Sequence, residues 1–251
     1  MAIHNLAFDP ELTADLAELH DDSEEDLVGA DWHQTAIRVV NEGLLLVGPE
    51  RGLPWHVGNQ LTTLMGQIGD KNWRPCPDIS VHPAAGMDAV LSFDTRVHGA
   101  PTVVIEVASE STYRYDLEAK RRSYARVGVQ EYLVFDPTHD WLGTAVRAWH
   151  ATAHGFEAWL PTRDGAWHSR ELGISFQVDG MLLRVVDADG VMMPHITEFG
   201  RLLREQQQEA EAYTRRLRVQ TEEADRRAEE QARRIAELEA ELRRNRQGDQ
   251  E

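Results

Sequence analysis

Residues 101–137 read PTVVIEVASESTYRYDLEAKRRSYARVGVQEYLVFDP, and this stretch decides the fold. Its opening, Pro101–Ala108, is apolar and β-branched except for Thr102 and Glu106, which is typical of a strand buried on both faces of a sheet. Tyr132–Phe135 forms a second short apolar run, and the segment between the two runs has helical spacing. A strand, a helix and a strand in this order predict a right-handed βαβ unit with parallel strands.

The helix of this unit is expected over Tyr113–Val127. The polar cluster Ser109–Thr112 can cap its start, and Gly128 can end it in the left-handed conformation. One face of the helix carries Leu117, Lys120, Tyr124 and Val127. A charged residue therefore lies on the face that packs against the sheet.

Upstream, residues 78–82 read DISVH and alternate with period two, so Asp78, Ser80 and His82 share one face of a further strand. Ionised carboxylates in a core are costly unless they are paired or bind a metal. Asp78, Glu106 and Lys120 can converge on one point, where two carboxylates hold a hard cation and a lysine steadies developing charge.

Simpler interpretations of these residues stay open. Glu106 can pair with an arginine, and Lys120 can pair with Asp116 at i,i+4 or extend its amine to solvent. One compositional feature favours a specific role for the lysine: of 26 basic residues, only Lys71 and Lys120 are lysines. Where arginine is the usual choice, a lysine on a packed face indicates that its own chemistry is needed.

The motifs resemble a known family. PD at 77–78, a glutamate on an apolar strand and a following lysine are similar to the PD-(D/E)XK nuclease superfamily. The longer pattern PDISV, IEVASEST, D-x-x-x-K at Asp116–Lys120 and Y-A-x-x-G-V-x-E-Y-L-x-x-D-P resembles the Uma-two family of endonucleases over roughly residues 26–200. In the general superfamily the lysine lies two residues after the acid, where this chain has Ala108. In the Uma-two pattern it comes from the following helix, which Lys120 matches.

The resemblance implies a restriction-endonuclease-like α/β fold with a mixed sheet flanked by helices. It implies metal ligands at Asp78 and Glu106, a catalytic lysine at Lys120, and Mg²⁺ or Mn²⁺ as cofactor. It also implies that a histidine on the first helix lies near the cleft. Four residues are therefore candidates to orient these groups or to contact substrate: His33, His82, Asp116 and Arg121.

The charge distribution is unusual for a nucleic-acid enzyme. The chain has 251 residues and a net charge of −17, whereas phosphate binding favours a basic surface. Ten of the acids lie in residues 1–31, which carry no Lys or Arg, and we expect residues 1–25 to form an acidic arm. The expected helix 113–127 is the most basic part of the remaining core.

Other elements are predicted from helix caps, from turn residues such as Gly, Asp and Pro, and from hydrophobic periodicity. We expect a helix from an Asp31 N-cap to about Val47, a strand over Trp55–Met65 and a polar linker over Ala84–Ala100 that can hold a short turn. After Pro137, short segments separated by Gly, Asp and Pro predict a β meander packed on the core. Its tryptophans can stack on bases, although hairpin packing explains them more simply.

The C-terminal region 198–251 predicts a long helix, because it contains no Pro and only Gly200 and Gly248 as glycines. A heptad seam runs along this helix, in which residues recur every seven positions from Leu217 to Leu238. Ile235 at position a and Leu238 at position d favour a parallel two-stranded coil. The seam is polar in its first half, so a single solvated helix is the alternative. A 26–197 nuclease-like domain followed by a coiled-coil helix is the expected organisation.

We expect a divalent-metal-dependent endonuclease that acts on nucleic acid, with DNA favoured, and that forms a homodimer through its C-terminal helix. The alternatives are a non-catalytic adaptor with a nuclease fold and, less favoured, a hydrolase of small phosphoesters. The lone Cys76 fits a reducing compartment. The opening has no basic residues before an apolar run, and no stretch has membrane-spanning length. We therefore expect a cytoplasmic location.

Overall fold

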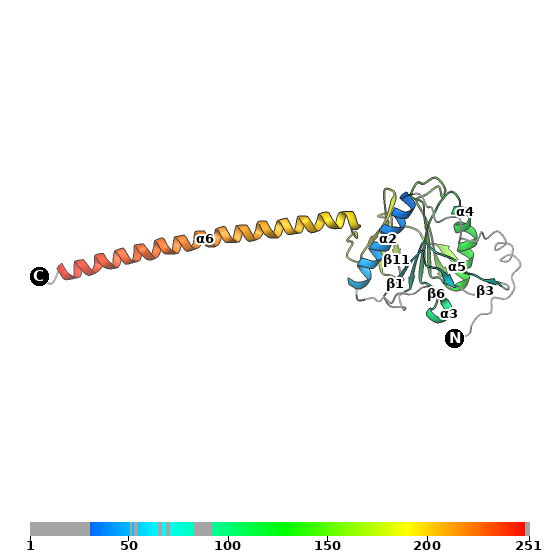
Figure 1. The fold of residues 1–251 in the computed structure, drawn as a ribbon, viewed down its shortest axis with the longest axis horizontal. Coiled ribbons are helices and arrows are strands. Elements are labelled where there is room, and N and C mark those ends of the chain that lie inside the picture. Colours follow the sequence, from blue (N-terminus) through cyan, green and yellow to red (C-terminus); the bar gives the residue numbers. More distant parts are fainter. Residues whose placement is uncertain are drawn as a thin grey trace. The chain divides into compact units, whose positions relative to one another are not determined.

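The structure is a computed structural model that describes residues 31–50, 52, 55–64, 67–68, 71–82 and 92–248. The chain divides into two compact units, the second of which begins at Ile196. The first unit is a mixed α/β fold, as expected (Figure 1). The predicted acidic arm lies outside the described residues.

The first unit is built on a six-stranded mixed sheet with the order β1-β5-β7-β8-β9-β10. Only β7 and β8 are parallel neighbours; every other adjacent pair is antiparallel. The strands of this sheet are β1 (His56–Asn59), β5 (Ile79–His82), β7 (Val103–Val107), β8 (Glu131–Phe135), β9 (Val146–Thr152) and β10 (Gly155–Ala158).

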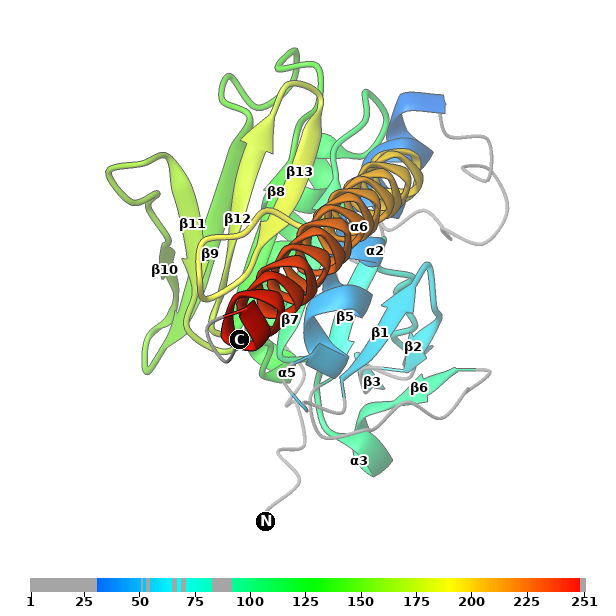
Figure 2. The same ribbon diagram turned by 90° about the vertical axis from the view of Figure 1, so that its left-hand side faces the viewer.

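A second, three-stranded antiparallel sheet follows in the chain. Its strands are β11 (Ala166–Ser169), β12 (Ile174–Asp179) and β13 (Leu182–Val186). The expected meander is therefore divided, because its first two strands continue the main sheet and the last three form a sheet of their own (Figure 2). The predicted packing on the core is confirmed, since Phe176 and Val185 belong to the same buried cluster as Ile105.

The main sheet separates two apolar cores. Ile105 and Leu133 point into a core shared with helix α2 (Asp31–Glu50) and the second sheet, whereas Val104 and Val134 point to the opposite face. Figure 1 shows α2 on one side of the strands and α5 on the other. The backbone of α2 approaches β13 closely: a Cβ added at Gly43 would lie 2.8 Å from Val185.

The predicted βαβ unit is confirmed, with β7 and β8 parallel and a helix between them. That helix is continuous but has three parts: α4 (Tyr113–Tyr115), a π-helical turn η1 (Asp116–Lys120) and α5 (Arg121–Val127). Gly128 ends it in the left-handed conformation, with φ of 95°. The π-helical turn was not expected from the sequence, and such turns are frequent at functional sites.

Two expectations need correction. The strand expected over Trp55–Met65 is interrupted, because Gln60 has a φ of 47° and separates β1 from β2 (Thr63–Leu64). The expected linker before Ala100 contains ordered structure, namely β6 (Phe93–Asp94), which pairs with β2, and α3 (Thr95–His98). A further short hairpin joins β3 (Gln67–Ile68) and β4 (Lys71–Asn72).

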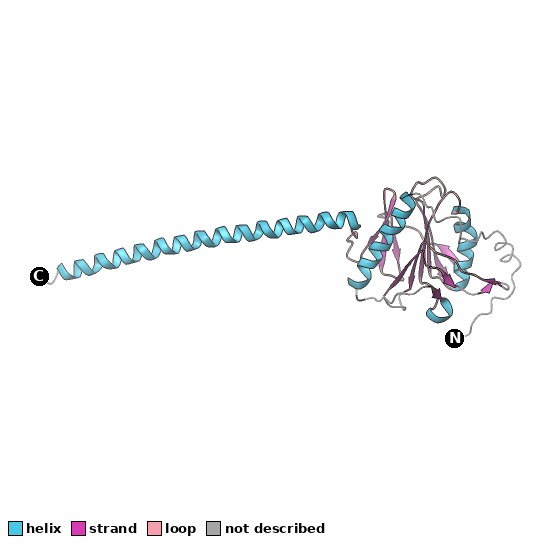
Figure 3. Cartoon of the chain, viewed as in Figure 1, coloured by secondary structure: helices cyan, strands magenta, loops and turns pink. Residues whose placement is uncertain are grey.

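The second unit contains the helix α6 (Ile196–Gly248), 53 residues long, which Figure 3 shows as unbroken. Its surface carries i,i+4 ion pairs such as Arg218–Glu222, which support an isolated helix. Two of the predicted seam residues, Leu217 and Leu238, are 45% and 46% exposed in the single chain. No helix of the described residues combines the length and the apolar character needed to cross a membrane.

Candidate active site

Asp78 and Glu106 meet where the ladder between β5 and β7 ends. Ile79 pairs with Ile105, so extending the antiparallel register by one residue places Asp78 opposite Glu106, on the same face of the sheet. At this position the carboxylate side chains, in place of backbone carbonyls, accept the hydrogen bonds of the backbone N–H groups. The Asp78 N–H donates to Glu106 Oε2 at 3.2 Å, and the Val107 N–H donates to Asp78 Oδ2 at 2.8 Å. The two carboxylates are thereby fixed to one another through the backbone.

The helix after β7 brings a lysine to these carboxylates. Lys120 Nζ lies 3.3 Å from Glu106 Oε1 and 3.0 Å from Asp116 Oδ1. One turn further on, the Tyr124 hydroxyl donates to Glu106 Oε1 at 2.7 Å. Asp116, Lys120 and Tyr124 follow one another at intervals of four residues, which keeps them on the face toward the sheet.

The site is deeply buried, and Asp78 is the most exposed of its carboxylates. Glu106, Asp116 and Lys120 are 2%, 1% and 6% exposed, whereas the side chain of Asp78 is 14% exposed. Burial raises the pKa of Glu106 to about 8, against the opposing effect of the Lys120 charge. Burial likewise raises the pKa of Asp78, although His33 and Lys120 oppose this. Both groups are therefore in an environment that disfavours their ionised forms unless another cation is present.

His33 reaches the same place from α2. Its Nε2 donates to the carbonyl of Val107 at 2.9 Å and lies 3.8 Å from Asp78 Oδ2. A donor at Nε2 fixes the tautomer, because a carbonyl oxygen can only accept. The imidazole thus joins the first helix to the end of β7, directly beside Asp78.

Residues 27–150 match the model of the Uma2 family, which is described as "Putative restriction endonuclease". This part of the chain is a Uma2 domain. A solved structure titled as "a putative nuclease belonging to DUF820 from Anabaena variabilis ATCC 29413" is similar at 21% identity, with a TM-score of 0.41, and the match covers 58% of this chain and 75% of that one. None of the curated proteins matches the chain.

The residues of the Uma2 domain fit a divalent cation by charge. Asp78, Glu106 and Asp116 contribute three negative charges when ionised and Lys120 one positive charge, which leaves −2 in a buried space. Among the described residues, no three His, Cys, Asp or Glu side chains form a ready-made set of metal ligands. Mg²⁺ does not require such a set, since it commonly binds one or two carboxylates and completes its shell with water and substrate phosphate.

Two of the sequence candidates lie away from the carboxylates. His82 is at the other end of β5, where its ring stacks on Phe93 at 3.6 Å between centroids and neighbours His56 and His98. Arg121 donates to the Leu117 carbonyl within its own helix and packs over Trp149. These contacts place both residues away from Asp78 and Glu106, and a contact with substrate stays a prediction for each.

Two tyrosines of the Uma2 domain belong to the site but were not proposed from the sequence. Tyr124 binds Glu106 directly, and the buried Tyr132 hydroxyl donates to the backbone carbonyl of Asp116 at 3.0 Å. The signal for Tyr124 was its position on the same helical face as Lys120. Tyr132 had no such signal, because its contact joins strand β8 to the helix across the interior.

Proposed function

We propose that the Uma2 domain is a divalent-metal-dependent nuclease that hydrolyses phosphodiester bonds of nucleic acid, with DNA as the favoured substrate. The excess of carboxylates over positive side chains in the buried site carries this proposal. The Lys120 ammonium contacts the carboxylates of Glu106 and Asp116, and Asp78 lies beside Glu106. One ammonium does not balance three buried carboxylates, so a divalent cation is the partner that would. The family description adds support for the reaction class.

In this proposal Asp78 and Glu106 would hold Mg²⁺ or Mn²⁺, because the sheet register brings their side chains together. The bound ion would supply Lewis-acid polarisation of the phosphoryl oxygen and lower the pKa of a bound water. Lys120 orients the attacking water and stabilises charge that develops on the phosphoryl oxygens, because its ammonium lies beside Glu106. His33 holds the backbone of Val107 and lies beside Asp78, the more exposed of the two proposed ligands, where substrate can approach.

An adaptor without catalysis is the second candidate. The net charge of −17 disfavours binding to phosphates, and α6 exposes large apolar side chains such as Leu217 and Ile235. A nuclease fold that recruits a partner through this helix would need no cation at Asp78 and Glu106. Whether the wild-type protein binds a cation at these carboxylates therefore separates the two functions.

The deciding experiment uses purified full-length chain with single- and double-stranded DNA and RNA, in Mg²⁺, in Mn²⁺ and in a chelator. We expect cleavage of at least one substrate that needs the cation and is lost in Lys120→Met. Lys71→Met is the matched control, because it removes the other lysine of the chain and should cleave as the wild type does. If no substrate is cut with either cation, or if Lys120→Met cleaves normally, the nuclease proposal fails.

A second experiment tests cation binding by comparing two buried glutamates. Glu106 and Glu131 are both buried glutamates on adjacent parallel strands, and burial raises the pKa of each. Glu131 accepts hydrogen bonds from Ser169 and the Arg170 N–H, so it serves a structural contact. Calorimetric titration with Mn²⁺ should show binding to wild type and Glu131→Gln and none to Glu106→Gln. Equal binding by both variants would place the cation elsewhere.

A further inference from the structure

Asp116 is buried in a way that the nuclease mechanism does not yet explain. It begins the π-helical turn and is 1% exposed, yet neither of its carboxylate oxygens accepts a hydrogen bond from a residue that the structure describes. Oδ1 is within ion-pair distance of Lys120, but the two groups are not aligned for a hydrogen bond. A buried carboxylate with unused acceptors is costly, so its presence calls for a function.

We propose that Asp116 is a positioning residue that retains the Lys120 ammonium when a divalent cation binds Glu106. This inference rests on the proposed function. The ammonium is now shared between Glu106 Oε1 at 3.3 Å and Asp116 Oδ1 at 3.0 Å. A cation on Glu106 competes for the same carboxylate and repels the ammonium. Asp116 then becomes the anion that keeps Lys120 in the site, and its unused acceptors become occupied.

The surroundings of Asp116 suit this task. Its backbone carbonyl is held by the Tyr132 hydroxyl, which fixes the turn to strand β8. The ring of Tyr115 lies 5.4 Å from Lys120 Nζ and bounds the space available to the ammonium. The π-helical turn spans Asp116 to Lys120, so the two side chains are brought together by the local backbone itself.

The lysine content of the chain makes the test direct. Protein labelled with ¹⁵N at lysine Nζ has two ammonium signals, from Lys71 and Lys120, and Lys71→Arg assigns them. Titration of wild type with Mg²⁺ should shift the Lys120 signal while its ammonium protons stay protected from exchange with water. In Asp116→Asn with Mg²⁺, these protons should exchange faster by about tenfold or more, because the charged acceptor is gone.

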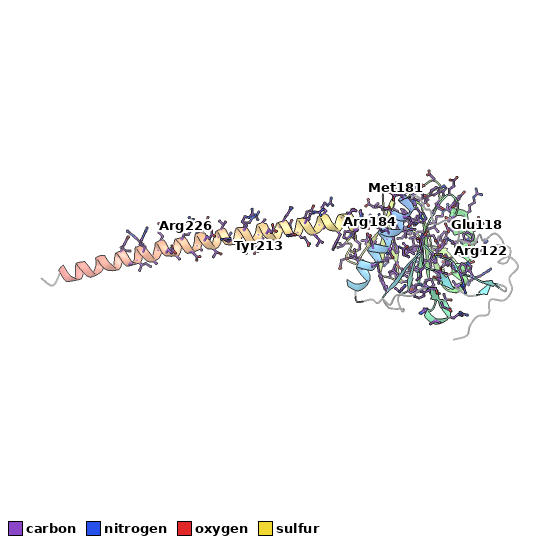
Figure 4. The ribbon with its side chains drawn as sticks, in the orientation of Figure 1. Glu118, Arg122, Met181, Arg184, Tyr213 and Arg226 are labelled. Carbon is purple, nitrogen blue, oxygen red and sulfur yellow. The ribbon has the colours of Figure 1, made fainter. Side chains whose placement is uncertain are left out.

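Glu118→Gln is the matched control. Glu118 carries the same charge on the same turn, but its side chain is exposed on the surface of the helix (Figure 4). This variant should behave as the wild type. In steady-state cleavage assays Asp116→Asn should lower kcat with little change in KM, since Lys120 is displaced while substrate binding is kept.

The outcomes separate the two proposals. If Mg²⁺ binds wild type and its Lys120 protons then exchange freely, Asp116 does not retain the ammonium, and this result needs no variant that must fold. If Asp116→Asn with Mg²⁺ protects Lys120 as well as Glu118→Gln does, the assignment is equally overturned. If Mg²⁺ leaves the wild-type Lys120 signal unchanged and calorimetry shows no binding, the metal-dependent function itself fails.

Discussion

The backbone N–H of Asp78 donates a 3.2 Å hydrogen bond to the carboxylate of Glu106, one position beyond the last pair of the β5–β7 ladder. The sheet register therefore places one proposed metal ligand against the other.

Metal-free Glu106→Gln should become more stable relative to wild type as the pH rises. The folded-state pKa of Glu106 is about 8, against an ordinary value of 4.5, so the folded protein holds a proton that the unfolded chain releases. The contribution of protonated Glu106 to the free energy of unfolding is therefore fully present below pH 4.5. It falls as the pH rises toward 8, by at most about 1.4 kcal/mol per pH unit. Glu106→Gln has no carboxyl to ionise and does not lose this contribution.

Chemical denaturation in a chelator at pH 5 and pH 8 measures the effect. The difference in free energy of unfolding between Glu106→Gln and wild type should grow from the lower to the higher pH. Glu118→Gln removes an exposed glutamate and should show no such growth. A constant difference across this range would contradict the high pKa of Glu106.

Tyr124→Phe should shift cation binding to higher pH. The Tyr124 hydroxyl donates to Glu106 Oε1, which lowers the pKa of that carboxyl, so its removal leaves the ionised form harder to reach. We also expect a loss of about 1–2 kcal/mol in the free energy of unfolding. Mn²⁺ titrations by calorimetry at several pH values report the shift.

Tyr132→Phe is the control for this experiment. It is an equally buried tyrosine, but its hydroxyl donates to the Asp116 carbonyl and not to Glu106. It should lose stability without moving the pH dependence of binding. The same displacement in both variants would mean that general loosening of the core, and not the hydrogen bond to Glu106, sets the pH dependence.

His82 should make the fold sensitive to acid. Burial, followed by the nearby His56 and His98, lowers the pKa of His82 to about 3 from an ordinary 6.5. The unfolded chain therefore takes up a proton that the folded chain does not. The stability contributed by neutral His82 is complete above pH 6.5 and is lost as the pH falls toward 3.

His82→Leu should accordingly lose less stability than wild type when the pH is lowered from 7 to 4.5. His154→Leu changes an exposed histidine and should follow the wild type. Denaturant unfolding curves at the two pH values give the comparison. Parallel losses in all three proteins would show that His82 titrates normally.

Association is expected to depend on α6. We predict a homodimer that weakens when the chain is cut after Gly200, because the seam residues Leu217, Ile235 and Leu238 are exposed in the single chain. The truncated protein should still bind Mn²⁺, since Asp78 and Glu106 belong to the first unit. Light scattering at equal concentrations decides the matter: a full-length monomer would argue for a solvated helix or for docking to another protein.

The sequence by itself was enough to predict the βαβ unit and the approach of Lys120 to the carboxylates. Strand period, helix period and the handedness of the crossover are local properties, and together they direct Glu106 and Lys120 to the same side of the sheet. The predicted family followed from the same motifs, which lie close together in the chain.

Only the tertiary structure decided which other residues reach the site. Period two placed His82 on the face of Asp78, but four residues along a strand separate them by roughly 13 Å, which puts His82 in a different cluster. Arg121 follows Lys120 directly, yet one residue turns the helix by about 100° and directs it to Trp149. Contacts such as Tyr132 to Asp116 join segments through the packed interior, where side-chain volume and hydrogen-bond geometry, rather than sequence period, select the partner.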